Sequence, residues 1–162
     1  MQRILLIVLG GFFLLTSIGQ QIKCVSSTRY LIPNFTANWH RANEYCFYLG
    51  MQLAIVETPG EHQIIASLVK DSEIFDVNRT VVWLGASDLG QEGIFYWHAT
   101  GLRLKYAAWG RGQPDDWRGQ EDCLVMANVP NNGWSWIAND SNCTAWYYFV
   151  CENMNASKID VF

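Results

Sequence analysis

The pattern of hydrophobic and polar residues divides the chain into a helical first half and a strand-rich second half. Apolar residues recur at three- and four-residue steps through Trp39, Ala42 and Cys46, and Gly50 follows. This spacing predicts a helix from Thr36 that Gly50 ends, with Cys46 on its buried face.

A second helix is predicted to begin at Thr58. Thr58 can cap this helix, Pro59 suits its first turn, and the Glu61 carboxylate can accept the Thr58 amide. Short apolar runs at residues 28–35 and 52–57 predict strands.

Beyond residue 71 the helical spacing gives way to short apolar runs. These runs predict strands at residues 81–85, 95–97, 124–127 and 145–151. Two polar segments, 105–122 and 128–143, are predicted to be long loops. Such loops in a compact domain are normally functional or disordered, and the tryptophans within these two argue against disorder. Two helices followed by strands and long loops predict one α+β domain.

The N-terminus has the pattern of a secretory signal. Arg3 precedes an apolar run at residues 4–15, and the small residues Ser17 and Gly19 follow. The run is shorter than the roughly 20 residues that a membrane-spanning helix needs. We therefore predict a cleaved signal peptide and a secreted, extracellular protein without a membrane span. The expected divisions are the signal peptide (1–19), an N-terminal segment (20–27), the main domain (28–153) and a C-terminal tail (154–162).

Composition narrows the range of partners. The formal net charge of the 162 residues is -4, and no Lys/Arg cluster is present, so a nucleic-acid partner is not expected. Five Asn-X-Ser/Thr sequons suit a secreted glycoprotein. They begin at Asn34, Asn78, Asn139, Asn142 and Asn155.

The five cysteines favour disulfides in a secreted chain. Four of them lie in the main domain and permit three pairings, between which spacing alone cannot decide. Cys24 is the fifth. It can form an interchain disulfide, and hence an oligomer, or remain an uncommitted thiol.

Side-chain oxygens are concentrated in the run Gln-Pro-Asp-Asp-Trp-Arg-Gly-Gln-Glu-Asp-Cys, residues 113–123, and in Asn139 and Asp140. Calcium takes six to eight oxygen ligands from carboxylates, carboxamides, carbonyls and water, so this mixture predicts a calcium site. Zinc is disfavoured because the three histidines are scattered and no Cys-x-x-Cys pair is present.

Together these motifs resemble the C-type lectin domain. The resemblance covers roughly Tyr30 to Asn153, nearly the whole mature chain. It rests on Trp83-Leu-Gly, Trp109, Gln113-Pro-Asp, Glu121-Asp-Cys, Asn139-Asp140 before Cys143, and Tyr148-Phe-Val-Cys151-Glu. It implies the C-type lectin fold in its short form, with two helices, antiparallel sheets and a long calcium-binding loop region. It also implies the disulfides Cys46–Cys151 and Cys123–Cys143 and a cis bond before Pro114.

The resemblance further implies two calcium sites. The primary one, which also binds sugar, would use Gln113, Asp115, Glu121, Asn139 and Asp140. The auxiliary one would use Asp88, Glu92, Asp116 and Asp122, with the backbone carbonyl of Glu121. The sequence departs from the family at Trp136, which Ile137 and Ala138 separate from Asn139, whereas the family usually places Trp directly before Asn-Asp. A glycan on Asn139 would block a ligand, so that sequon is expected to be unused.

In the family, Gln-Pro-Asp goes with galactose-type sugars and Glu-Pro-Asn with mannose-type sugars. Trp117 strengthens the galactose interpretation because an indole can cover the apolar face of galactose. The expected function is a secreted calcium-dependent lectin for galactose-type glycans on glycoproteins, cells or microbes, with a role in innate immunity. The alternative is a lectin-like protein-interaction module that has lost sugar binding. A glycosidase is disfavoured because every candidate acid already has a calcium role.

Overall fold

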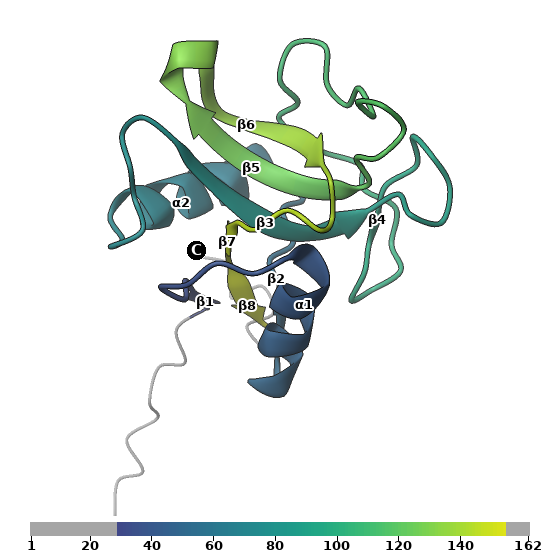
Figure 1. The fold of residues 1–162 in the computed structure, drawn as a ribbon. Helices are drawn as coiled ribbons and strands as arrows, with labels where there is room; N and C mark the ends of the chain where they lie inside the picture. Colours follow the sequence, from purple (N-terminus) through teal and green to yellow (C-terminus); the bar gives the residue numbers. More distant parts are fainter. Residues whose placement is uncertain (1–28, 155–162) are drawn as a thin grey trace, which may run out of the picture.

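A computed structural model of the chain describes residues 29–154 (Figure 1). The predicted signal peptide, Cys24 and most of the C-terminal tail lie outside these residues. Two helices and two sheets form the described part, and long loops join several of the strands. The predicted α+β class is confirmed. Within residues 29–154, no helix has the length and apolar character required to cross a membrane.

Helix α1 (Trp39–Tyr48) has the predicted buried face. The Asn38 side chain caps its N-terminus by accepting a hydrogen bond from the Arg41 amide at 2.9 Å. The helix therefore begins at Trp39, three residues after the predicted start at Thr36. Cys46 is fully buried, as its spacing indicated.

Helix α2 (Pro59–Lys70) begins where predicted, with Pro59 in its first turn. Thr58 Oγ1 accepts the amide of Glu61 at 3.2 Å. Glu61 Oε2 accepts the amide of Glu57 at 2.9 Å, one residue before the amide that was predicted. Two amides at the start of the helix are therefore still satisfied by side chains.

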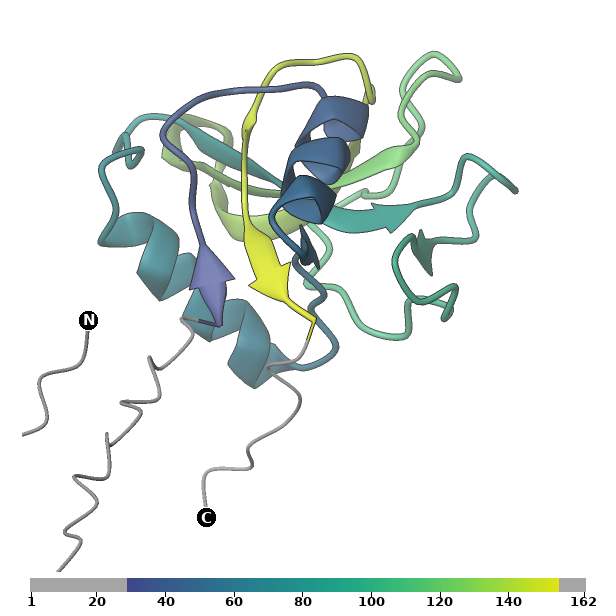
Figure 2. The same ribbon diagram turned by 90° about the horizontal axis from the view of Figure 1, so that it is seen from below.

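The smaller sheet brings the two ends of the described chain together (Figure 2). Its strands are antiparallel in the order β1-β8-β2. Strands β1 and β2 are shorter than the strands predicted at residues 28–35 and 52–57. The strands are β1 (Tyr30–Leu31), β8 (Cys151–Asn153) and β2 (Met51–Leu53).

The larger sheet has the path β4-β3-β5-β6, and β7 pairs in parallel with β3. Its strands are β3 (Thr80–Ser87), β4 (Tyr96–Trp97), β5 (Cys123–Val129), β6 (Trp134–Ser141) and β7 (Tyr148–Phe149). A 3-10 turn, η1 (Pro130–Asn132), joins β5 to β6. The prediction of a loop over 128–143 is therefore wrong. Residues 134–141 of this segment form a strand because β6 pairs antiparallel with β5.

Two disulfides lie in the core that α1 shares with the sheets. Cys46 pairs with Cys151, and Cys123 pairs with Cys143, which confirms both implied pairings. The first ties α1 to β8, and the second joins the start of β5 to the segment after β6.

Buried tryptophans in the same core are hydrogen-bonded. Trp39 Nε1 donates to the carbonyl of Leu84 at 2.9 Å, and Trp83 Nε1 donates to the carbonyl of Ala37 at 2.9 Å. Gly85 on β3 lies against the backbone of β2, because an added Cβ would fall 2.7 Å from the carbonyl oxygen of Leu53. This close approach explains the need for glycine in the Trp-Leu-Gly motif.

Candidate functional site

Two groups of three carboxylates lie at the loop end of the larger sheet. The first group consists of Asp115, Glu121 and Asp140, and the second of Asp88, Glu92 and Asp122. Within each group, one oxygen from every residue lies within 4.8 Å of the others. The structure thus brings together acids that are up to 34 positions apart in the sequence (122 - 88 = 34).

Strand β6 positions the key acid of the first group. Asp140 pairs with Leu124 of β5 and is 1% exposed. Its Oδ2 accepts the amides of Asp115 at 3.0 Å and Asp116 at 2.7 Å. The buried carboxylate therefore holds the 113–116 segment against the sheet, using charge-assisted hydrogen bonds.

The loop that carries Gln113 is also anchored to β6. The Gly110 amide donates to the carbonyl of Ala138 at 3.0 Å, and the Ala138 amide donates to the carbonyl of Ala108 at 2.8 Å. A Cβ on Gly110 would fall 2.9 Å from Ile137 Cδ1, so this contact requires glycine or a displaced Ile137. The Gln113–Pro114 bond is cis, as expected.

The segment after Pro114 adopts an unusual backbone. Asp116 and Arg118 have positive φ values of 39° and 64°, which are uncommon for residues other than glycine. Asp116 Oδ1 accepts the amide of Glu121 at 3.1 Å, and the Gly119 amide donates to the Asp116 carbonyl at 2.8 Å. Asp116 belongs to neither three-carboxylate group and instead braces the turn that carries Glu121.

The second group is built around the end of β3. Asp88 follows this strand and is 2% exposed. Its Oδ2 accepts the amide of Gly93 at 2.8 Å, and its own amide donates to the carbonyl of Asp122 at 3.1 Å. These bonds tie the 88–93 turn to the residue before Cys123. Glu92 lies exposed on the same turn.

Three buried oxygens at this end of the molecule have no hydrogen-bond partner among the described residues. They are Asp88 Oδ1, Gln113 Oε1 and Asn139 Oδ1. Only one other buried side-chain atom of residues 29–154, the Tyr30 hydroxyl oxygen, shares this state. An unpaired buried polar atom is costly, and three of these four atoms belong to predicted ligand residues, where a cation could satisfy them.

Burial and mutual repulsion shift the titration of these acids. Burial, with the charge of Glu92, raises the pKa of Asp88 to about 6. Burial also raises the pKa of Glu121 and of Asp140, and the Asp140 charge contributes to the shift of Glu121. Raised carboxyl pKa values mean that the anionic forms lack sufficient positive charge nearby. A divalent cation in either group would supply that charge.

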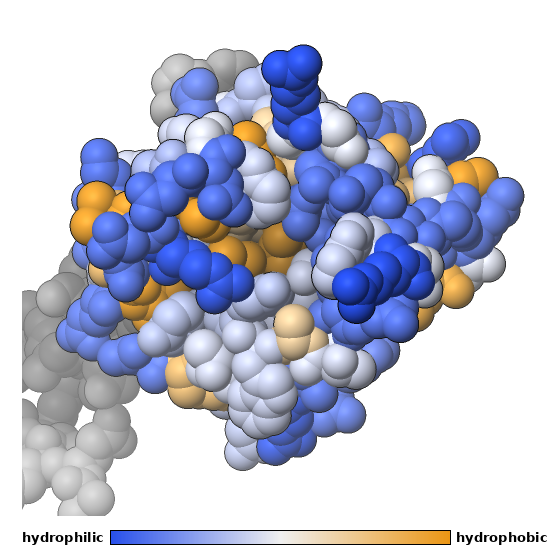
Figure 3. Space-filling model, turned by 45° about the horizontal axis from the view of Figure 1, so that its top comes forward, coloured by the Kyte–Doolittle hydropathy of each residue, from blue (hydrophilic) through white to orange (hydrophobic). Residues whose placement is uncertain are grey.

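Asn139 Nδ2 donates to the backbone carbonyl of Asp140, and its Oδ1 has no hydrogen-bond partner among the described residues. Asn139 and Glu121 also line a groove of about 230 Å³ over β5 and β6. Figure 3 views this side of the domain, where hydrophilic side chains predominate and hydrophobic ones show within a hollow. Asn139 is 8% exposed; that its sequon is unused stays a prediction.

The departure at Trp136 has a structural reason. Trp136 has a positive φ of 50°, and the β5–β6 register shifts between Ala127 and Val129. Its ring stacks on Phe75 at 6.1 Å, and its carbonyl lies 2.6 Å from His62 Nε2. The tryptophan therefore packs toward α2, while Asn139 and Asp140 keep their places near the carboxylates.

Trp117 lies at the surface as expected, with 58% of its area exposed. The guanidinium of Arg118 lies 4.0 Å from the centre of its ring, within cation–π distance. One face of the indole is thus covered by Arg118.

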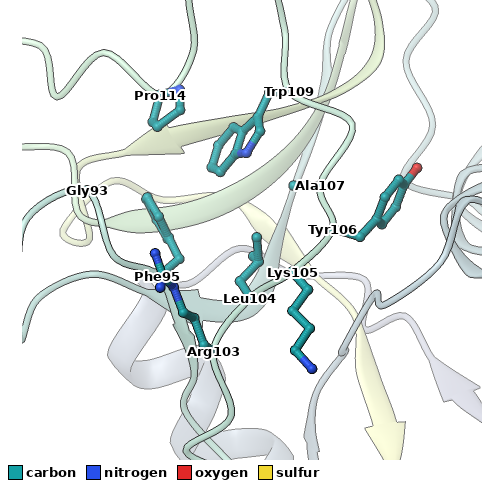
Figure 4. A pocket seen from close by; sticks show the side chains of 9 residues that line it. All are labelled: Gly93, Phe95, Arg103, Leu104, Lys105, Tyr106, Ala107, Trp109 and Pro114. Carbon is teal, nitrogen blue, oxygen red and sulfur yellow. The ribbon is translucent and has the colours of Figure 1, made fainter.

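The sequence did not predict a cavity of about 330 Å³ beside Pro114 (Figure 4). Phe95, Trp109 and Tyr106 contribute its aromatic lining, and Arg103 is one of its cations. The sequence feature that points to this cavity is the pair Arg103 and Lys105, two residues apart in a segment with few other charges.

The fold and the site define a disulfide-bonded α+β binding domain with an oxygen-rich loop end. Residues 35–153 match the family model of the lectin C-type domain. The chain belongs to the C-type lectin domain family.

Curated relatives and solved structures agree with this family. Salivary C-type lectin 1 of Aedes albopictus is 38% identical over 134 residues, covering 83% of this chain and 88% of the relative. C-type lectin 16 of Aedes aegypti is 37% identical over 134 residues, covering 83% and 87%. The carbohydrate-recognition domain of the mouse scavenger receptor C-type lectin has a TM-score of 0.63 and 27% identity, covering 76% and 85%. These proteins are lectins, and the chain is accordingly a binding protein and not an enzyme.

Proposed function

We propose that the protein is a secreted, calcium-dependent lectin that prefers galactose-type glycans. The observation that carries the calcium part is the set of unpartnered buried oxygens on Asp88, Gln113 and Asn139. Each belongs to a residue that the family resemblance places at a calcium site, and each lies in a region where carboxylates converge.

The ligand sets follow from this convergence. Gln113, Asp115, Glu121, Asn139 and Asp140 would hold the primary ion; Asp88, Glu92 and Asp122 would hold the auxiliary ion. Asp116 would support the auxiliary site from the turn that it braces. Calcium coordinates carboxylate and carboxamide oxygens, and both kinds are present here.

The residues around the primary site also suit a sugar. When bound, calcium supplies coordination positions that two neighbouring sugar hydroxyls can fill. Gln113 can donate a hydrogen bond from its amide, whereas Asp115 can only accept. This order of donor and acceptor, with the exposed indole of Trp117 nearby in sequence, supports the galactose preference over mannose.

Secretion and glycan targets complete the proposal. Two disulfides favour an oxidising compartment, and relatives are named as salivary lectins. We place the targets on glycoproteins, cells or microbes, with innate glycan recognition as the role. The interchain bond through Cys24 stays a prediction, because that residue lies outside the described part of the chain.

Retention on galactose-agarose tests the proposal. The correctly oxidised protein should bind the resin in millimolar calcium and elute with EDTA. The Asp140→Asn variant should not bind, whereas Asp71→Asn, which changes an exposed acid at the end of α2, should bind normally. A folded protein that ignores galactose resin and every sugar of a glycan array in calcium would instead favour the protein-interaction module.

Exchanging the donor and acceptor sides tests the sugar preference. Gln113→Glu combined with Asp115→Asn should shift the inhibition ranking from galactose toward mannose by about tenfold, because a lost or reversed hydrogen bond is worth about 1 kcal/mol or more. Competition by the two monosaccharides on a calcium-loaded surface measures the ranking. An unchanged ranking would show that other residues set the preference.

A further inference from the structure

The cavity beside Pro114 lies next to the proposed sugar site. Pro114 is the residue between Gln113 and Asp115, and it forms part of the cavity wall. Gly93, which follows Glu92 of the second carboxylate group, forms another part. The volume of about 330 Å³ is at the lower end of the range for small-ligand pockets.

The cavity has an aromatic wall that suits the apolar face of a saccharide. The rings of Phe95 and Trp109 lie 5.3 Å apart and are tilted by 58°. Figure 4 shows the Trp109 ring near Pro114, with the Phe95 ring packed against it and Leu104 alongside. Aromatic rings and a proline offer apolar surface against which the C–H groups of a sugar can pack.

Two cations accompany this wall. Arg103 and Lys105 are both exposed, and neither has a carboxylate within 4.0 Å among residues 29–154. In Figure 4 the Arg103 side chain extends toward Phe95 and Gly93, whereas the Lys105 amino group points away from Trp109. Arg103 is therefore the closer cation, and Lys105 adds positive potential on a flexible stem.

Acidic side chains lie near the cavity that these two cations line. The proposed metal sites gather acids, and Glu92 lies one residue before Gly93. Without metal this end of the domain repels anions. One calcium ion in each group would cancel most of its negative charge, and Arg103 and Lys105 would then be the cations that face an anion at the cavity.

We propose that this cavity is a subsite for an anionic saccharide unit, carrying a carboxylate or a sulfate, next to a galactose-type residue of the same glycan. The inference rests on the proposed function, because the galactose-type residue occupies the primary site. It names the glycan class as acidic oligosaccharides.

A matched pair of disaccharides tests the subsite. Lactobionate joins galactose to a chain that ends in a carboxylate, and lactitol joins galactose to the same chain with a neutral end. Calorimetry in calcium and low salt should show tighter binding of lactobionate by about threefold to fivefold, the range of an exposed ion pair. The preference should shrink in 0.5 M NaCl because salt screens exposed charges. Lactose sulfated on its glucose unit, compared with lactose, separates sulfate from carboxylate as the preferred anion.

Variants locate the effect. Arg103→Ala should remove most of the lactobionate preference, and Lys105→Ala a smaller part, while lactitol affinity stays constant. The control Arg41→Ala/Lys70→Ala removes two exposed cations elsewhere and should keep the preference. Equal affinity for lactobionate and lactitol, and for the sulfated and plain lactose, would overturn the subsite and leave the proposed function intact.

Failure of the primary site has a different signature, in which neither galactose nor lactitol binds in calcium. The subsite is then read directly from the Trp109 indole N–H signal in a nitrogen-15 NMR spectrum, assigned with Trp109→Phe. Millimolar glucuronate should shift this signal in calcium, and glucose should not. No shift with glucuronate would overturn the subsite.

Discussion

Buried acids differ in their hydrogen bonding between the loop end of the domain and the end where β1 and β8 pair. Glu152 on β8 is 6% exposed, and its two oxygens accept hydrogen bonds from Arg29 Nε and the Ile55 amide, each at 3.0 Å. Asp88 is 2% exposed, yet its Oδ1 has no partner among the described residues.

This difference separates an acid that the fold itself satisfies from the acids that we propose bind calcium. The Glu152 carboxylate is satisfied by the protein itself, so its contribution belongs to stability. The acids of the loop end repel one another and keep raised pKa values, which disfavours their anionic forms in the metal-free protein. Stability changes at the first end should therefore be independent of calcium, and changes at the second should depend on it.

The disulfides should show the largest contrast. Cys46–Cys151 spans 105 positions and Cys123–Cys143 spans 20, so chain entropy predicts losses of about 4–5 and about 3 kcal/mol when each pair is replaced by alanine. The first loss should be the same with and without calcium. The second variant should also bind calcium more weakly, because Cys123 follows Asp122. Urea unfolding in calcium and in metal-free buffer measures both. Equal weakening of calcium binding by the two double variants would contradict the contrast.

Single carboxylates give a matched test of smaller size. Asp140→Asn should weaken calcium binding by about 100-fold while changing metal-free stability little, because an amide oxygen can still accept the Asp115 and Asp116 amides. Glu152→Gln should lower stability by about 1–3 kcal/mol and leave calcium affinity unchanged. Calcium calorimetry and urea unfolding of both variants provide the comparison. A loss of calcium affinity in Glu152→Gln would show that the two ends are coupled.

Acidification should also distinguish the two ends. Because the pKa of Asp88 is raised to about 6 in the metal-free fold, protons occupy it below that pH and compete with calcium. Calcium affinity should therefore fall as the pH drops through 6, by up to about tenfold per pH unit for each competing proton. The increase in Tm that calcium causes should become smaller accordingly. Thermal unfolding of dialysed protein at pH 7.5 and 5.0, with and without calcium, measures this. A calcium effect that stays constant over this range would exclude proton competition.

The pKa of Glu61 is shifted in the opposite direction to that of Asp88. Burial raises the pKa of Glu61, but the hydrogen bonds that it accepts from the Glu57 amide and from Arg29 lower the pKa by more. The net pKa is therefore below its ordinary value. Its stabilising contribution is present above its ordinary pKa and is lost as pH falls through the lowered value. That loss should appear equally in calcium and in metal-free buffer.

Local patterns predicted the helices and most strands because their signals are short-range. The periodic apolar residues and the Thr58-Pro59 start identified α1 and α2, and apolar runs identified β3 and β5. Strand β6, Trp-Ser-Trp-Ile-Ala-Asn-Asp-Ser, was missed because its second half is polar and the residues before it are rich in Pro, Asn and Gly. Pairing with β5 across the short η1 turn defines it, and strand propensity depends on such pairing more than on composition.

The site shows the same limit. Oxygen-rich residues in 113–123 were visible in the sequence, and the family resemblance supplied their grouping. The bracing role of Asp116 depends on its positive φ and its bond to the Glu121 amide. The cavity beside Pro114 depends on how the 103–107 segment folds against Trp109. Neither could be read from residue types, because both arise from the three-dimensional path of the loops.

The smallest expected effect concerns the two exposed tryptophans, Trp117 at the loop end and Trp146 before β7, which are 58% and 68% exposed. Trp117→Ala should weaken galactose binding by about fivefold, or about 1 kcal/mol, because the sugar loses an aromatic surface to pack against. Calcium affinity should not change, since the indole supplies no ligand oxygen. Trp146→Ala removes the same ring elsewhere and should leave both affinities unchanged. Galactose titrations in saturating calcium decide the matter: equal affinity of the two variants for galactose would remove Trp117 from the sugar site while leaving the metal ligands in place.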